Sequence, residues 1–379
     1  MGYLVDSSIR CGNACDVQVS VDADIVEVSF APDPHGGPEC MWFCFRLVPV
    51  APTQARQVRL VLKNVQNMLG GNQPGNIRPV VRPAGGDWRR LDAPAVVELP
   101  DGRYNAAWML EAPQRPLDVA LCYPYDLTDL HALLRRMQGR LLGDVIGVSQ
   151  KARPILRLSN SYGNAGDSRP GIYVVARQHA GETPGSWVLD GFLEHIATLG
   201  PQAPLVWAVP LADIDGVEEG NYGKDHFPYD LNRAWGNPPM RHEVLVIKRD
   251  IERWKKRCRP VLGIDLHAPG ACEAEGIYAY VPDPRCLPGI HQQTTRWTQH
   301  AAEALADRFA APDFARVAEY PSRWESPHFT GCFWSQHELP AFALETPYAL
   351  TGGGVLSRED YQEAGRRLAV GICRALAAL

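Results

Sequence analysis

The chain contains no long apolar run, no CxxC motif and no excess of basic residues. No stretch reaches the ~18 to 20 apolar residues that cross a bilayer. The opening residues, MGYLVDSSIRCGNACD, hold no apolar core of the kind found in a secretion signal. The net charge of -5 over 379 residues gives no electrostatic reason to expect nucleic acid as a partner. We therefore expect a cytoplasmic protein that binds neither membrane nor nucleic acid.

The ten cysteines are scattered, and no two of them form a CxxC motif. Cys11/Cys15 and Cys40/Cys44 are close in sequence, but this spacing does not complete a structural zinc motif. We expect reduced thiols that are mostly buried, as is usual in the cytosol. One basic run, RWKKRCR at 253–259, lies in an expected helix and is interpreted as a solvated face.

Residues 1–125 show the pattern of a small antiparallel β-sandwich domain. Short segments rich in Val, Phe, Trp and Tyr are separated by turn sequences such as PDPHGGPE and LPDGR, and no long amphipathic helix interrupts them. We expect strands over 16–20, 25–31, 41–50, 57–64, 77–82, 96–99, 103–110 and 119–123. Such a series of short strands is typical of two packed antiparallel sheets.

Residues 126–379 show the pattern of an α/β domain. A helix is expected from about 126, with Asp126 or Thr128 as its cap. Further helices are expected over 186–198, 241–257, 291–310 and 358–378, and strands over 171–177, 204–210, 261–266, 277–281 and 341–344. The segment 213–235 is expected to be a loop, because its glycines and Pro228 interrupt any period. Alternating strands and helices predict a mostly parallel mixed sheet with helices on both faces.

Three polar clusters follow strands of this expected sheet. His179 and Glu182 come after one strand, His267 ends another, and Glu345 ends a third. Ligands of α/β sheets collect at the carboxyl ends of strands. Two histidines and one glutamate form a known catalytic zinc set, so the clusters predict one zinc ion per chain. Taken alone, the His179/Glu182 pair is better interpreted as a surface turn, and Glu345 alone is consistent with an ordinary strand end. The joint occurrence of the clusters carries the prediction.

Other polar residues suit the same chemistry. Glu345 is a candidate general base beside the metal, and Asp265 can orient a ligand because it lies two residues before His267 on the same strand face. The loop ends in DLNR. Arg233 can hold a carboxylate at two points, and Asn232 can add a donor. Without the neighbouring clusters, these two residues would be interpreted as a surface arginine beside a helix cap.

These motifs together resemble one enzyme family. HAGE, DIDGVEEGNY, DLNRAW, GIDLHA and ALETPY are similar to motifs of the M14 family of zinc carboxypeptidases, and more narrowly of its cytosolic carboxypeptidase-like branch. MWFCFRL, RLVLKNVQN, NIRPVVRPAGGDWRRL and ALCYPYDLTDL resemble the same branch, so the likeness covers nearly the whole chain. It implies an enzyme that hydrolyses C-terminal residues from peptides or proteins. It also implies His179, Glu182 and His267 as zinc ligands, Asn232 and Arg233 as the carboxylate clamp, and Glu345 as the base.

The sequence departs from the branch where an oxyanion donor is expected. The branch usually has an arginine after GNY, whereas this chain has Gly223 and then Lys224. Lys224 can supply a positive charge, but as a point charge rather than a fork. Arg177 and Arg323 are the next candidates for that donor.

The sequence does not determine which C-terminal residue such an enzyme would remove. Glutamate-removing members have a basic residue roughly fifteen positions before the base, where this chain has Phe329 and Thr330. His328 and Arg323 are near but not aligned with that position. Tyr320 and Tyr348 are candidates for a tyrosine over the substrate.

Two other functions fit the same motifs. A zinc amide hydrolase of the aspartoacylase type shares the HxxE, DLNR and strand-end histidine pattern, and a non-catalytic binding protein could use the same scaffold. The β-sandwich and the GNY loop favour the carboxypeptidase over the deacylase. The complete ligand set with Glu345 speaks against a degenerate scaffold. Nothing in the sequence indicates the oligomeric state.

Overall fold

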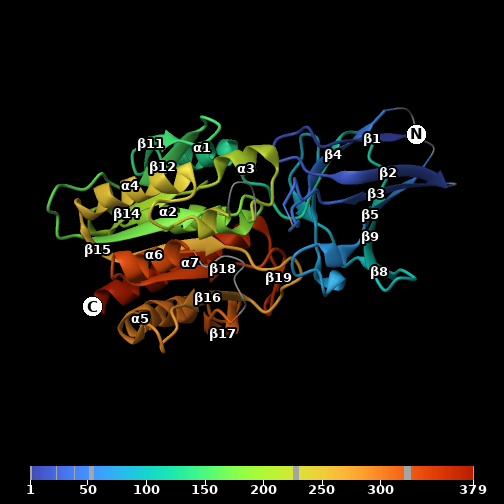
Figure 1. Ribbon diagram of the computed structural model, residues 1–379. Coiled ribbons are helices and arrows are strands. Elements are labelled where there is room, and N and C mark those ends of the chain that lie inside the picture. The colour runs from blue at the N-terminus through green and yellow to red at the C-terminus, as the bar shows by residue number, and fades with distance from the viewer. Residues whose placement is uncertain are drawn as a thin grey trace.

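The protein has two lobes, one built of β-strands and one of alternating strands and helices (Figure 1). The computed structural model describes residues 2–22, 24–37, 39–50, 55–224, 230–319 and 326–378. The strands of the β lobe come from the N-terminal part of the chain, and the first helix of the other lobe begins at Leu127. The expected fold class is confirmed.

The β lobe is a sandwich of two five-stranded sheets, ordered β1-β4-β10-β6-β7 and β2-β3-β5-β9-β8. Their bounds are β1 Tyr3–Asp6, β2 Cys15–Asp22, β3 Ile25–Ala31, β4 Cys44–Pro49, β5 Gln57–Leu62, β6 Val80–Pro83, β7 Arg89–Arg90, β8 Ala95–Glu98, β9 Tyr104–Glu111 and β10 Leu117–Ala120. One pair departs from the antiparallel expectation: β3 and β5 are parallel, because the intervening β4 crosses to the other sheet. β1 and β7 were not predicted.

The second lobe contains an eight-stranded mixed sheet in the order β11-β12-β14-β13-β15-β18-β16-β17. Their bounds are β11 Leu142–Val148, β12 Pro154–Ser159, β13 Pro170–Ala176, β14 Leu205–Val209, β15 Arg259–His267, β16 Ile277–Val281, β17 Ala310–Val317 and β18 Ala341–Glu345. β11, β12 and β17, which the sequence did not predict, are at the two edges of the sheet. The central strands β14, β13, β15 and β18 run parallel.

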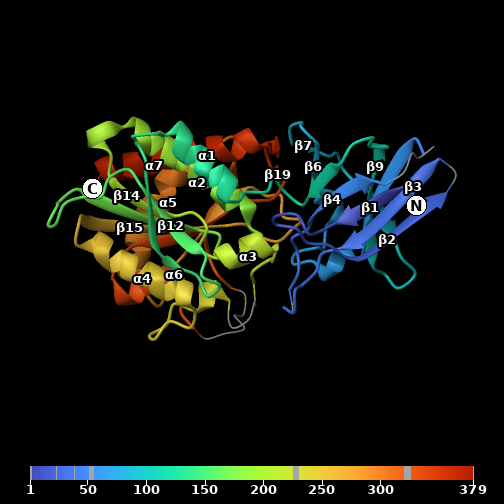
Figure 2. The ribbon, with the colours of Figure 1, turned by 90° about the horizontal axis from the view of Figure 1, so that it is seen from above.

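Helices cover both faces of this sheet, as expected (Figure 2). α2 (Thr183–Thr198), α5 (Pro288–Leu305) and α7 (Arg358–Ala377) pack on one face, and α4 (His242–Lys255) and α6 (Phe329–Gln336) pack on the other. A hairpin of β19 (Leu350–Thr351) and β20 (Gly354–Val355) precedes α7. The helix expected over 291–310 runs instead from Pro288 to Leu305, and Ala310 begins β17.

The prediction of an uninterrupted loop over 213–235 is wrong, because α3 (Ile214–Glu219) forms within it. Asp213 caps this helix by accepting a hydrogen bond from the Gly216 backbone. A Cβ atom on Gly216 would lie 2.7 Å from the Cβ of Ala180 and 2.5 Å from an oxygen of Asp213. Gly216 is therefore present for close packing, whereas in the sequence it looked like a helix breaker.

A buried acid joins α1 (Leu127–Arg136) to α2. Asp190 accepts a hydrogen bond from the Tyr125 hydroxyl at 2.6 Å, and Arg136 lies 3.5 Å from its other oxygen. Burial raises the pKa of Asp190 to about 7, although Tyr125 and Arg136 oppose that shift. The folded state therefore holds this proton more tightly than the unfolded chain does.

We expect Asp190→Asn to remove a pH dependence of stability. A pKa raised by folding stabilises the protein below about pH 4, and this contribution, roughly 4 kcal/mol, disappears as pH rises through about 7. The asparagine variant should match the parent near pH 4, where Asp190 is protonated in both states, and should exceed the parent's free energy of unfolding at pH 8. Urea unfolding followed by tryptophan fluorescence measures both. An equal difference at both pH values would contradict the buried-acid interpretation.

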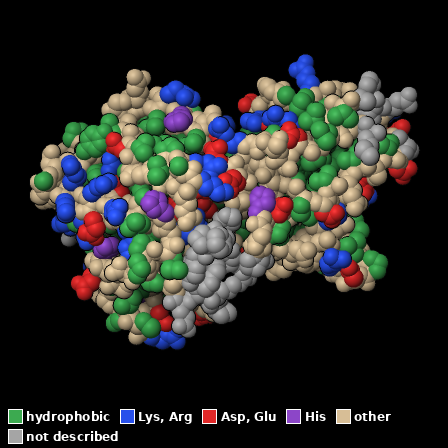
Figure 3. Space-filling view, turned by 45° about the horizontal axis from the view of Figure 1, so that its top comes forward, with side chains coloured by type: hydrophobic (Ala, Val, Ile, Leu, Met, Phe, Trp, Pro, Cys, Tyr) green, Lys and Arg blue, Asp and Glu red, His purple; other side chains and the backbone are tan. Residues whose placement is uncertain are grey.

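The described surface carries interspersed side chains of both charge signs. Figure 3 shows Lys, Arg, Asp and Glu side chains interspersed on the visible face of both lobes. Arg253, Lys256 and Arg257 of the basic run are exposed, in agreement with a solvated face, and Lys255 pairs with Glu252 at 3.1 Å. No described helix combines the length and the apolar character that a membrane span requires.

Candidate metal centre and active site

Three neighbouring strands bring the predicted clusters together. β13 and β18 pair with β15 on its two sides, all in parallel. The loop after β13 therefore places His179 and Glu182 beside His267 at the end of β15, and the register pairs His267 with Glu345 at the end of β18. The sheet gathers these four side chains at one edge.

The turn after β13 is held by Arg177. Its φ of 60° reverses the chain, and its buried guanidinium donates to the Ala180 carbonyl at 2.7 Å and to the Tyr125 carbonyl at 3.0 Å. Arg177 thus fixes the back of the loop that carries His179 and Glu182. This orientation removes it from the candidates for an oxyanion donor.

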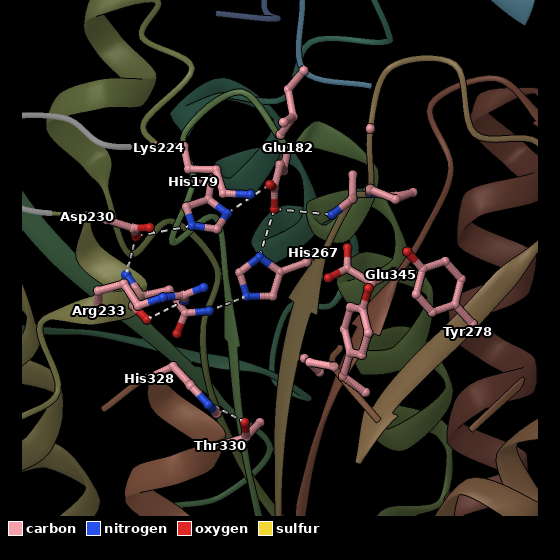
Figure 4. A pocket seen from close by; sticks show the side chains of 18 of the residues that line it. His179, Glu182, Lys224, Asp230, Arg233, His267, Tyr278, His328, Thr330 and Glu345 are labelled. Atoms are coloured by element: carbon pink, nitrogen blue, oxygen red, sulfur yellow. Dashed lines mark hydrogen bonds and ion pairs between the residues drawn. The ribbon is translucent and has the colours of Figure 1, made fainter. Parts of the chain in front are cut away.

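The two imidazoles face the same carboxylate (Figure 4). Nδ1 of His179 lies 2.8 Å from one oxygen of Glu182, and Nδ1 of His267 lies 2.8 Å from the other. One ligand atom from each of the three residues lies within 4.8 Å of the others, and all three side chains are buried. Two imidazole nitrogens and one carboxylate are donors that suit zinc.

The outer nitrogens of the two rings are held by carboxylates. Nε2 of His179 lies 3.2 Å from Asp230, and Nε2 of His267 lies 2.8 Å from Asp265. Such carboxylate contacts fix the tautomer and orientation of metal-binding histidines. Asp265 contacts His267, as the sequence predicted from its place on the same strand face. Asp230 was missed in this role, although it stands in the DLNR motif, because no spacing rule relates it to His179.

Electrostatics favour a cation between these groups. Burial opposes a positive charge on His179 and His267, but Glu182, Asp230 and Asp265 outweigh burial and raise the pKa of both rings. Burial alone would raise the pKa of Glu182, and the two imidazoles instead lower it. The carboxylates around the two imidazoles therefore favour positive charge at this point. A divalent cation can supply that charge in place of the two imidazole protons.

The cluster lies in a cavity of about 620 Å³ to which both lobes contribute. Leu69 and Gly70 of the β lobe form part of its wall, and a Cβ on Gly70 would lie only 2.6 Å from Gly270. The Ala271 backbone donates to the Leu69 carbonyl at 2.9 Å. This close glycine contact fixes the two lobes together at the rim of the cavity.

Glu345 lines the cavity beside His267 (Figure 4). Burial raises its pKa to about 7, although His267 and Lys224 lower it in part. Tyr278, paired with Glu345 across β16 and β18, lies next to it and donates its hydroxyl to Glu273 at 3.1 Å. Tyr278 was not singled out in the sequence, since only the sheet register places it beside the candidate base.

Lys224 lines the same cavity, and its side chain extends toward His179 and Glu182 (Figure 4). The residue before it cannot carry a side chain. A Cβ on Gly223, whose φ is 94°, would lie 2.3 Å from the Ala180 backbone nitrogen. The missing arginine after GNY thus has a local cause: here the chain packs directly on the loop that carries His179 and Glu182.

Asn232 and Arg233 lie in a turn next to His267. The Asn232 oxygen accepts from Gln178 and from the Phe329 backbone, both at 3.0 Å, and its amide nitrogen lies 3.0 Å from Nε2 of His267. Arg233 lines the cavity and donates to the Asn232 carbonyl at 2.9 Å. Asn232 therefore lies against His267 and faces the cavity.

The other residues that the sequence left as candidates differ in position. Some line the cavity, one is buried away from it, and two lie outside the described residues. His328 and Thr330 line the cavity, and burial lowers the pKa of His328 to about 4, with Arg233 adding to the shift. Nδ1 of His328 accepts from the Gly331 backbone at 3.0 Å. Tyr348 is buried behind the loop that carries His179 and Glu182. It donates to the Gly181 carbonyl at 3.4 Å, so it does not cover the cavity. Tyr320 and Arg323 lie outside the described residues.

Comparison with known proteins agrees with the resemblance. No family model matches the chain. It is 25% identical over 291 residues to cytosolic carboxypeptidase 6 of Caenorhabditis elegans, covering 70% of this chain and 62% of that protein. It is 33% identical over 181 residues to cytosolic carboxypeptidase 2 of Xenopus tropicalis, covering 39% and 18%. The chain spans less than two thirds of the length of these relatives.

Solved structures share the fold over both lobes. The metallo-carboxypeptidase of Burkholderia cenocepacia superposes with a TM-score of 0.78 at 18% identity and covers 100% of both chains. A metallo-carboxypeptidase of Pseudomonas aeruginosa, solved with (2-guanidinoethylmercapto)succinic acid, gives 0.74 at 19% identity over 99% of both. The fold is thus that of two-lobed metallo-carboxypeptidases. The relatives confirm the similarity to the cytosolic carboxypeptidase-like branch of the M14 family.

Proposed function

We propose that this protein is a zinc-dependent metallocarboxypeptidase that removes C-terminal residues from peptides or proteins. One observation carries the proposal: His179, Glu182 and His267 converge in a cavity that Glu345 and Arg233 also line. That combination supplies a metal site, a base and a cation for a terminal carboxylate. The names of the relatives and of the fold neighbours support the same reaction.

The residues present fit zinc. Two imidazole nitrogens and one carboxylate, with carboxylates behind both rings, match the donors of catalytic zinc sites. When bound there, zinc acts as a Lewis acid that makes water nucleophilic at neutral pH and polarises the scissile carbonyl. The chain itself supplies the remaining functions.

Each of these functions has a residue in the cavity. Arg233 binds the terminal carboxylate, and Asn232 adds an amide donor beside it. Glu345 accepts the proton of the attacking water and passes it to the leaving amine. Lys224 provides positive charge for the oxyanion that develops on the scissile carbonyl. The product is a shortened peptide and one free amino acid.

We expect Lys224→Met to lower kcat and kcat/KM together by about 10²- to 10³-fold, because one preorganised oxyanion donor is lost. Zinc content should stay unchanged. Lys224→Arg should restore little, since its fork starts from the wrong backbone position. Lys256→Met, at the exposed C-terminal end of α4, is the matched control. Parent-like kinetics of Lys224→Met would place the oxyanion donor elsewhere, with Arg323 as the next residue to test.

A peptide screen tests the function as a whole. Zinc-loaded protein is incubated with peptides that vary at the C-terminus, and products are identified by mass spectrometry. Loss of single C-terminal residues, abolished by C-terminal amidation, is the expected result. Cleavage of N-acylated amino acids without trimming of peptides would instead support the deacylase alternative, which shares the HxxE and DLNR pattern.

A further inference from the structure

The β lobe grips the loop that leads to Lys224. Asn13 is buried, with 1% of its surface exposed, and its amide nitrogen donates to the Gly220 carbonyl at 2.8 Å. The same side chain is fixed within the β lobe, since it donates to the Asp33 carbonyl at 3.0 Å and accepts from the Asp33 backbone at 2.7 Å. Asn13 therefore connects two loops of the β lobe to one point after α3.

A second and a third contact strengthen this grip. Gly220 has a φ of 71°, and a Cβ there would lie 2.1 Å from the Gly12 carbonyl oxygen, so the two backbones touch. His35 of the β lobe makes a short hydrogen bond through Nδ1 with Oδ1 of Asn221. Figure 2 shows α3, which ends just before these residues, on the side of its lobe that faces the β lobe.

The opposite side of the same loop supports the reaction centre. The Tyr222 carbonyl accepts from the Gly181 backbone at 2.8 Å, and its hydroxyl lies 3.5 Å from Glu182. Gly223 packs on Ala180, as described above, and Lys224 then enters the cavity. Loop 220–224 is thus held between the β lobe and the metal-binding loop.

We propose that Asn13 and His35 are positioning residues of the β lobe, which hold loop 220–224 so that Lys224 faces the reaction centre. The inference rests on the proposed function of Lys224, and it makes the β lobe a working part of the active site. Asn13 and His35 contact the loop directly, and the backbones of Gly12 and Gly220 touch. Loss of one of these contacts allows the loop to shift, which moves the ammonium group of Lys224 away from the developing charge. A displacement of about 1 Å can cost about 10²-fold in rate.

The test compares His35→Ala, His35→Asn and Asn13→Ala in the full, zinc-loaded chain. Asparagine keeps an amide nitrogen near the place of Nδ1 and tolerates the positive φ of 48° at this position. Gln66→Ala is the control. Its side chain accepts from the Tyr104 backbone at 2.9 Å within the β lobe. The first measurement is amide hydrogen exchange of residues 216–224, which needs no activity.

We expect exchange in this segment to become about tenfold faster in His35→Ala and Asn13→Ala. It should stay near the parent rate in His35→Asn and Gln66→Ala. Unchanged exchange in both alanine variants overturns the proposal. If Asn13→Ala does not fold, His35→Ala and His35→Asn decide alone.

Kinetics supply the second measurement. His35→Ala should lower kcat at unchanged KM and unchanged zinc content, and it should add nothing to the loss caused by Lys224→Met, because both changes remove one effect. Additive losses, or a loss of zinc in parallel with kcat, overturn the positioning role. A parent protein that trims no peptide refutes the proposed function, while the exchange data still decide whether the β lobe holds the loop.

Discussion

His267→Ala is expected to abolish stable zinc binding. The variant removes one of three protein ligands and leaves Glu182 and Asp265 each without a contact of 2.8 Å. Zinc affinity should fall by more than about 100-fold, since even partners behind a ligand typically account for about 10- to 100-fold. Metal analysis after dialysis, with a parent sample that retains one zinc per chain, measures the loss.

Two further variants make the result specific. Asp265→Asn leaves all three ligands in place but weakens the support of His267, so we expect a loss of about 10- to 100-fold. His131→Ala changes an exposed histidine of α1 and should bind zinc like the parent. Thermal unfolding shows whether His267→Ala is folded. Full zinc stoichiometry in a folded His267→Ala protein would exclude His267 as a ligand.

The sequence predicted the ligand cluster because local patterns determined it. His179 and Glu182 share one turn, and His267 and Glu345 each end an apolar strand. Strands β13, β15 and β18 are adjacent and parallel, so residues at their carboxyl ends had to meet. The general α/β pattern was sufficient for this step, and no knowledge of side-chain contacts was needed.

Contacts between distant segments could not be predicted in the same way. Asp230 behind His179 and Tyr278 beside Glu345 depend on the fold of a loop and on the order of strands. The helix α3 was missed because Gly216 disfavours a helix locally, and its reason for being there is a contact with Ala180. In each case a tertiary contact outweighed the local signal.

The β lobe also contains pairings and contacts that local sequence patterns do not predict. Its strands were recognised from alternation and turns, but the parallel pair β3 and β5 follows from a crossover that no local pattern records. Nor does the sequence show that Asn13, far from every motif, touches Gly220. The function proposed for this lobe follows only from the contacts on both sides of loop 220–224, which the sequence does not show.

Glu345→Gln is expected to retain zinc and to lose nearly all turnover. The amide has the shape of the carboxylate, and the strand pairing that places residue 345 beside His267 does not involve the side chain. It cannot accept a proton at neutral pH, so the attacking water is no longer deprotonated and the leaving amine receives no proton. A general base of this kind typically contributes about 10²- to 10⁴-fold, so kcat should fall within that range.

KM and zinc content separate this loss from damage to the site. Arg233 still binds the substrate carboxylate, and the three ligands are unchanged, so both quantities should remain near the parent values. Glu345→Asp keeps the carboxylate but withdraws it by one methylene, and we expect an intermediate loss because misplacement by about 1 Å can itself cost about 10²-fold. Glu98→Gln, on an exposed strand of the β lobe, is the matched control. A folded, zinc-loaded Glu345→Gln protein that turns over like the parent would assign the base to another group. Tyr278 and Glu273, which line the same cavity, would be tested next.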